Sequence, residues 1–159
     1  ALVMKAASSI NQLATALYPA SSRDAHQPSL RALYYRLHIG LFALSLMGVI
    51  FFYPVGHAVL TFWLRDPPLV SAVHSTLSIF IWYFAILILT PLPSTILDSH
   101  GRPGLTSLFT ALTVGLEISL AVYLLPRLGL LAPPLAGLIA VLVTTPPLLV
   151  VTERVLVAK

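Results

Sequence analysis

The sequence contains no cysteine, which excludes disulfide bonds, catalysis by a thiolate and iron–sulfur clusters held by cysteine. It also carries few charges: only 9% of its 159 residues are Asp, Glu, Lys or Arg, and only five of these are acidic. The net charge of +4 is spread along the chain without a basic cluster that alternates with aromatic residues. The sequence therefore predicts no nucleic-acid partner.

The signatures of common enzyme sites are absent as well. There is no glycine-rich phosphate loop, no HExxH motif and no pair of catalytic carboxylates. No two of the five histidines are three or four residues apart, so a metal site on one helix is not predicted. Ligation of a haem or chlorophyll by a single histidine stays open. We expect neither an enzyme nor a catalytic residue, a metal or a cofactor.

What the sequence does contain is apolar residues, 58% of the total, gathered in four long stretches. These stretches cover residues 38–64, 69–97, 105–125 and 130–151, and Glu117 is the only charged residue in any of them. A helix needs about 20 apolar residues to cross the hydrocarbon core of a bilayer. The sequence therefore predicts an all-α integral membrane protein, a single domain built as a bundle of four transmembrane helices.

The first 20 residues are moderately apolar and carry a polar stripe. This pattern predicts a helix that either forms part of a further membrane helix or lies at the interface. Lys5 belongs to this segment. It is then either a cation inside the bilayer that faces a cavity, or a contact to lipid headgroups.

The distribution of Lys and Arg predicts the orientation. The short loops make neighbouring spans antiparallel, so alternate loops lie on the same side. One side then holds Lys5, Arg23, Arg31, Arg36, Arg102, Arg154 and Lys159, and the other holds Arg65 and Arg127. The positive-inside rule places both termini in the cytoplasm, and the expected location is the inner membrane of a bacterium.

Glu117 is the most unusual residue, because it lies near the middle of the span predicted over residues 105–125. An ionised carboxylate is costly at that depth, so we expect it to be protonated, paired or in contact with a wet cavity. One interpretation is a site for a proton, a cation or a polar substrate. The other is a hydrogen bond between neutral groups of two helices.

His74 and five prolines allow two interpretations each. His74 lies one turn into the second span, where it forms part of the same cavity as a ligand or proton relay, or makes a hydrogen bond between helices. Kinks are expected inside the spans at Pro54, Pro91, Pro93, Pro146 and Pro147. Such kinks suit a transporter that alternates between states, and they also occur as static features of membrane helices.

The order of several motifs resembles a known family. The motifs are Leu17-Tyr-Pro-Ala-Ser-Ser-Arg23, the basic run over residues 30–37, Phe62-Trp-Leu-Arg-Asp66, His100-Gly-Arg102-Pro and Leu124-Leu-Pro-Arg-Leu-Gly129. Together they resemble the polysaccharide and lipid-linked oligosaccharide flippases, of the multidrug and toxin extrusion superfamily. This chain departs from the family at Glu117, where asparagine is usual, and at Ala132-Pro133-Pro134, where small residues are usual.

The resemblance implies a function. Members of the family have two lobes around a central cavity, and this chain supplies the helices of about one lobe. The substrate would be a lipid-linked sugar, Lys5 and Glu117 would line the cavity, and a second lobe would be needed, because one lobe cannot alternate alone. The alternative is an accessory subunit of a larger membrane complex, such as a photosynthetic or respiratory assembly, with apolar surfaces and no wet cavity.

Overall fold

The computed structural model describes residues 28–157, and all regular structure in this range is helical. The helices are α2 (Pro28–Leu64), α3 (Pro67–Leu87), α4 (Pro91–Ser99), α5 (Pro103–Leu128) and α6 (Ala132–Val157), with the short 3₁₀ helix η1 (Gly129–Leu131) between the last two. The prediction of an all-α protein is confirmed for these residues. The helix expected over residues 1–20, which includes Lys5, lies outside them.

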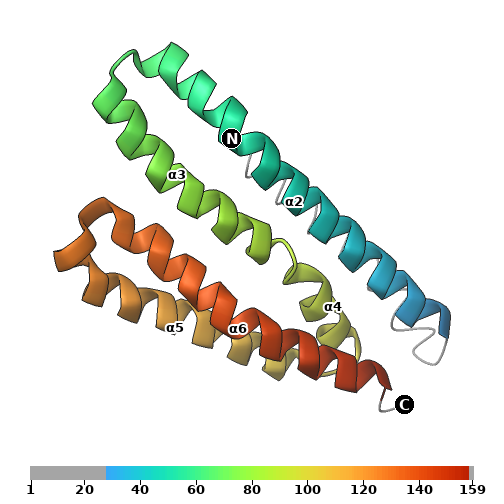
Figure 1. Ribbon diagram of the computed structural model, residues 1–159. Coiled ribbons are helices and arrows are strands. Elements are labelled where there is room, and N and C mark those ends of the chain that lie inside the picture. Colours follow the sequence, from blue (N-terminus) through green and yellow to red (C-terminus); the bar gives the residue numbers. More distant parts are fainter. Residues whose placement is uncertain (1–27, 158–159) are drawn as a thin grey trace.

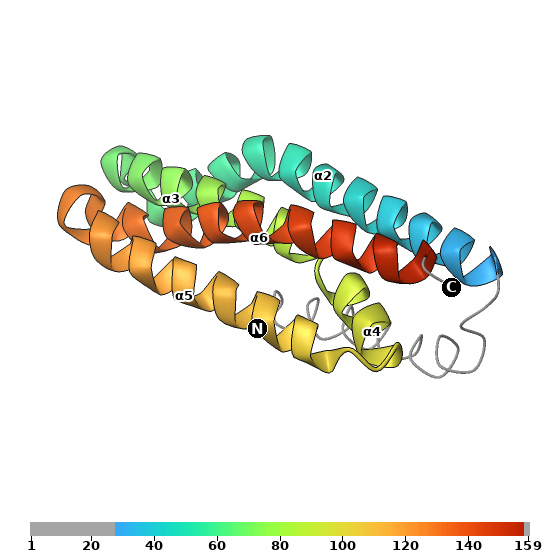
Figure 2. The same ribbon diagram turned by 90° about the horizontal axis from the view of Figure 1, so that it is seen from below.

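The helices form two antiparallel hairpins that pack side by side (Figure 1). α2 pairs with α3, α5 pairs with α6, and α6 also packs against α3. The short α4 packs against both α5 and α6, as Figure 2 shows from below. The α2–α3 turn and η1 lie at one end of the bundle. The start of α2, the α4–α5 turn and the end of α6 lie at the other, which we call the α4–α5 end (Figure 1).

Three helical stretches are long and apolar enough to cross a membrane: Arg31–Leu64, Pro67–Ser99 and Pro103–Val157. The expectation of four separate apolar helices is therefore wrong for the described residues, which form three continuous stretches. The reason lies at η1, where the chain stays helical between the spans predicted over residues 105–125 and 130–151. These two form a single stretch of 55 residues that turns back on itself at Gly129, whose φ is 55°.

The other helix bounds also differ from the expected ones. The first helix begins at Pro28 rather than at residue 38, so that it includes the basic run before the apolar stretch. The helix expected over residues 69–97 is divided: α3 ends at Leu87 and α4 starts at Pro91. Pro91 and Pro93 lack the N–H groups that would continue the helix across this point. Proline suits the first turn of a new helix, where no such donor is needed.

The other three of the five prolines at which kinks are expected lie inside helices. Pro54 is within α2, and Pro146 and Pro147 are within α6. Both helices continue through these positions, so the kinks expected there stay a prediction. Each proline leaves the carbonyl four residues before it without its usual helical donor.

Small residues dominate the buried face of α6 in its first half. Ala132, Ala136 and Ala140 recur every four residues and are 0% exposed, and Gly137 beside them is buried. Small residues at this spacing let neighbouring helix backbones approach closely. This face brings α6 against α3 on one side and α5 on the other.

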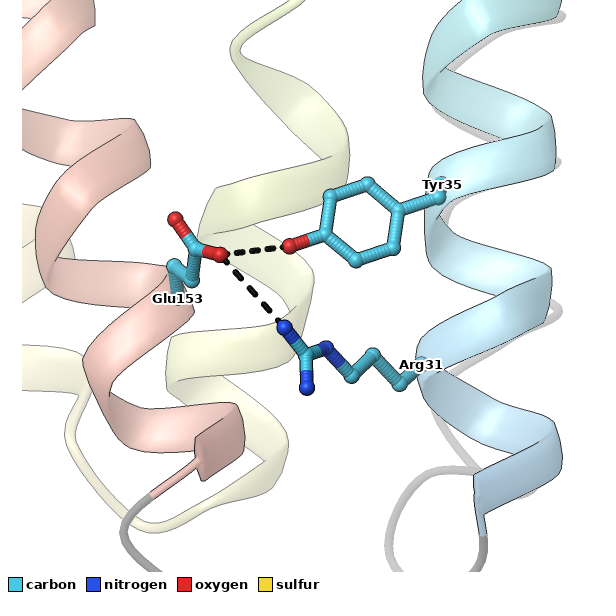
Figure 3. A network of polar contacts seen from close by, with 3 residues as sticks. All are labelled: Arg31, Tyr35 and Glu153. Carbon is cyan, nitrogen blue, oxygen red and sulfur yellow. Dashed lines mark hydrogen bonds and ion pairs between the residues drawn. The ribbon is translucent and has the colours of Figure 1, made fainter.

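Polar contacts tie the first turns of α2 to the last turns of α6 (Figure 3). The Tyr35 hydroxyl donates a hydrogen bond of 2.6 Å to Glu153 Oε1, and Arg31 Nη2 lies 3.6 Å from the same oxygen. The neighbouring residue of α2, Tyr34, packs with Leu92 and Ile96 of α4 in a buried cluster. The α4–α5 end is therefore held by an apolar cluster under a half-exposed polar network.

We expect Ala140→Leu to destabilise the bundle. The position is fully buried, and extra carbon atoms in a packed interior cost about 1–3 kcal/mol, a decrease of roughly 2–12 °C in apparent Tm. The matched control is Val143→Leu, because Val143 is on the same helix and 55% exposed. Thermal aggregation of both variants in detergent, followed by size-exclusion chromatography, tests this. Equal melting of the two variants would contradict the buried face.

A second prediction concerns the link between α2 and α6. Tyr35→Phe should lower the apparent Tm by about 2–4 °C, the effect of losing about 1 kcal/mol of hydrogen bonding. Glu153→Ala should have a similar effect, and the double variant should melt no lower than the worse single variant, since both remove the same contact. Additive losses in the same melting assay would show that the two side chains act independently.

Candidate functional site

A cavity of about 260 Å³ lies among α3, α4, α5 and α6. Five apolar side chains line part of it: Leu87, Phe109, Val114, Val141 and Leu148. The other lining residues each carry a polar group, although most of the wall area is apolar: Tyr83, Thr90, Ser94, Thr106, Thr110, Thr113, Glu117, Thr144 and Thr145. A concentration of seven aliphatic hydroxyl groups and one carboxylate is unusual inside so apolar a bundle.

The polar wall follows one face of α5. Thr106, Thr110, Thr113 and Glu117 are separated by four, three and four residues, which places them on one side of a helix. With a rise of 1.5 Å per residue, the row extends over about 16 Å. We call this row the polar track. The sequence analysis considered Glu117 alone and missed the threonines, although their spacing is visible in the sequence.

Hydrogen bonds link the polar track to α4 and α6. The Thr106 hydroxyl donates to Asp98 Oδ1 at 2.7 Å, next to the α4–α5 turn. Further along, the Thr144 hydroxyl donates to the carbonyl oxygen of Ala140 at 2.8 Å. The Thr113 hydroxyl lies 2.8 Å from the Thr144 oxygen and 2.8 Å from the carbonyl oxygen of Phe109 on its own helix, so these two acceptors compete for its one proton.

Glu117 forms the inner end of the polar track, where three helices meet. A Cβ atom added to Gly137 of α6 would lie 3.3 Å from Glu117 Oε1 and 3.0 Å from Cε2 of Tyr83 on α3. The absence of a side chain at Gly137 therefore makes room for both groups. Within residues 28–157, the carboxylate makes no hydrogen bond or ion pair. Its expected neutral partner, a serine or threonine on a neighbouring helix, does not appear there.

Thr145 leaves a second polar group unpaired in the cavity wall. The residue is only 4% exposed, and its Oγ1 is buried without a hydrogen-bond partner in the described part of the chain. Most hydroxyls on the helices of this protein instead donate to a carbonyl of the preceding turn, as Thr144 does. Buried polar groups usually have a partner, so this hydroxyl is a candidate for binding water or a ligand.

His74 lies elsewhere, between α2 and α3. Its ring stacks on Phe52 with centroids 5.5 Å apart and contacts His57 at 5.4 Å. His74 does not line the cavity. The structure therefore does not place it beside Glu117, although one interpretation of the sequence put both residues in the same cavity. The approach of His57 and His74 was missed because a search for histidines three or four residues apart detects only pairs on one helix. The described residues contain no group of three or more side chains suited to a metal.

Comparison of the chain with protein-family models, curated protein sequences and solved structures finds no match. The resemblance to flippases therefore depends on the sequence motifs alone. Lys5, the other residue that this resemblance places in the cavity, lies outside the described residues. The functional argument must come from the cavity itself.

Proposed function

We propose that the protein is an integral membrane protein that acts as one lobe of a flippase-like transporter. The observation that carries this proposal is the cavity: hydroxyl groups and the Glu117 carboxylate gather inside a bundle whose helices are otherwise apolar. Polar groups within a membrane are costly, and they commonly mark the path of a substrate or an ion.

The outer surfaces of the bundle support insertion in a bilayer. Large apolar side chains on the outer helices are more than half exposed, among them Ile39, Phe42 and Ile50 of α2 and Ile118 and Val122 of α5. Apolar surface on this scale favours contact with lipid or with other membrane proteins over contact with water. This is the surface expected of membrane helices.

Under this proposal the bilayer is crossed four times. A straight helix of 55 residues would be about 80 Å long, far more than the hydrocarbon core of about 30 Å. Because the third stretch turns back at Gly129, α5 and α6 each become a separate crossing of 26 residues. Such a helix measures about 39 Å, which is sufficient to span.

The charges at the two ends give the proposed orientation. The α4–α5 end carries Arg31, Arg36, Arg102 and Arg154, and the opposite end carries Arg65 and Arg127. The positive-inside rule then places the α4–α5 end in the cytoplasm. In a bacterium this corresponds to the inner membrane.

The cavity favours the transport lobe over the accessory subunit, for which no wet cavity is expected. Its rim is open, because Thr110 and Val114 are exposed. Polar groups left uncovered in lipid cost several kcal/mol, which favours a second lobe over this face. Hydroxyls and a carboxylate are suited to hydrogen bonding with the headgroup of a lipid-linked sugar.

Native mass spectrometry of the particle extracted from its own membrane tests the proposal. We expect the mass of this lobe with a second lobe and with bound lipid-linked sugar. A much larger particle with many other subunits and no bound sugar lipid would contradict it and favour the accessory role.

Glu117→Gln tests the cavity in the same experiment. Loss of the charged acceptor should reduce the affinity for the sugar lipid by about tenfold, equal to about 1.4 kcal/mol. The matched control is Ser119→Ala, because the exposed Ser119 hydroxyl bonds only within its own helix, to Gly115 O at 2.7 Å. Equal binding of the sugar lipid by both variants at every pH would show that Glu117 is not part of the binding site.

A further inference from the structure

The polar track differs along its length. From Glu117 towards the α4–α5 end, the face of α5 carries Thr113, Thr110 and Thr106, and Asp98 follows at the end of α4. The protons of Thr106 and Thr110 are donated to Asp98 Oδ1 and to the Thr106 carbonyl, so these hydroxyls offer their oxygens as acceptors. The row therefore supplies polar contacts from the inner end of the cavity to the surface of the bundle.

In the opposite direction the same face becomes apolar. The next positions on α5 at helical spacing are Leu120, Ala121 and Leu124. On α6, Ala136 and Ala132 are 0% exposed, so the small-residue face closes the space beyond Gly137. The cavity lining contains no polar residue beyond Glu117 on α5 in this direction.

We infer that the polar track is a water-filled half-channel that connects Glu117 with the aqueous phase at the α4–α5 end only. This inference deepens the proposed function, on which it depends for the membrane around the bundle. The track conducts water, and the water in turn carries hydronium. Protons would therefore reach Glu117 from one side of the membrane.

The cavity has the volume and the chemistry for this role. At about 30 Å³ per molecule, 260 Å³ holds roughly eight waters. Thr145 offers a buried hydroxyl that lacks a partner, which a water molecule would satisfy. The other titratable groups along the track are Tyr83 of α3, beside Glu117, and Asp98 of α4, which accepts from Thr106; the described part of α6 adds none to the cavity wall.

The absence of cysteine in the chain makes a direct test possible. Single substitutions Thr106→Cys and Thr113→Cys place a thiol on the track, and Leu112→Cys, at an exposed position beside Thr113, is the matched control. A charged, membrane-impermeant methanethiosulfonate reagent is added to one side of sealed vesicles at a time. Only a thiolate reacts, and a thiolate requires water around it.

Two further variants identify the sides. Gly104→Cys marks the α4–α5 end, and Leu130→Cys, at a residue 88% exposed in η1, marks the other end. We expect Thr106→Cys and Thr113→Cys to react from the side that labels Gly104→Cys, at least about tenfold faster than Leu112→Cys, whose thiol stays protonated in lipid. When the reagent is added to the side that labels Leu130→Cys, Thr106→Cys and Thr113→Cys should react no faster than the control Leu112→Cys.

Two outcomes would overturn the inference. Reaction of Thr113→Cys from both sides would show a path through the whole bundle, and reaction as slow as Leu112→Cys from both sides would show a dry cavity. Thr110→Cys, at the exposed rim, repeats the measurement if Thr113→Cys does not fold. Labelling from the α4–α5 side in a particle without a second lobe would refute the proposed transporter but support the half-channel. A two-lobe particle whose track does not react would support the transporter but refute the half-channel.

Discussion

The close approach of α6 to its neighbours is the contact on which the rest of the bundle depends. α6 lies between α3 and α5, and the face it presents to them is built from Ala132, Ala136, Gly137 and Ala140. In a bilayer, helices gain little from apolar burial, and packing at short distance would then provide the association. The same face sets the site, because Gly137 leaves the space that Tyr83 and Glu117 share. Larger side chains there would separate the helices and remove the inner end of the cavity.

The hydroxyl groups of this chain divide into two classes. Those of Ser75, Thr76 and Ser78 donate to carbonyl oxygens of the preceding turn of α3, so they add no unpaired donor to an apolar helix. Two hydroxyls of the cavity wall are different: Thr106 of the polar track bonds to the carboxylate of another helix, and Thr145 of α6 bonds to nothing in the described range. A hydroxyl that does not satisfy itself locally is available to water or a ligand. This difference, rather than the number of serines and threonines, marks the cavity.

The sequence was sufficient for the helical class and for the apolar stretches, because length and the lack of charge determine both. It was insufficient for the count of separate helical stretches, since Pro126 and Gly129 resemble a break and the chain nevertheless stays helical through η1. Glu117 was found from its rarity alone. Its surroundings were not, because the contact with Gly137 depends on how α5 and α6 pack. The distance between His57 and His74 likewise depends on the pairing of α2 and α3, which no local pattern encodes.

The position of Glu117 bears on whether its role is structural. A carboxyl group kept for packing would be expected opposite a donor on a neighbouring helix, because pairing offsets its desolvation. The group opposite Glu117 on α6 is Gly137, which has no side chain, and the neighbouring Tyr83 presents carbon atoms of its ring at that point. The threonine pair that does join α5 to α6 lies one turn away, at Thr113 and Thr144. The hydrogen bond between α5 and α6 thus lies beside Glu117 and leaves the carboxylate facing the cavity, which favours contact with water or a bound molecule over a role in holding the helices together.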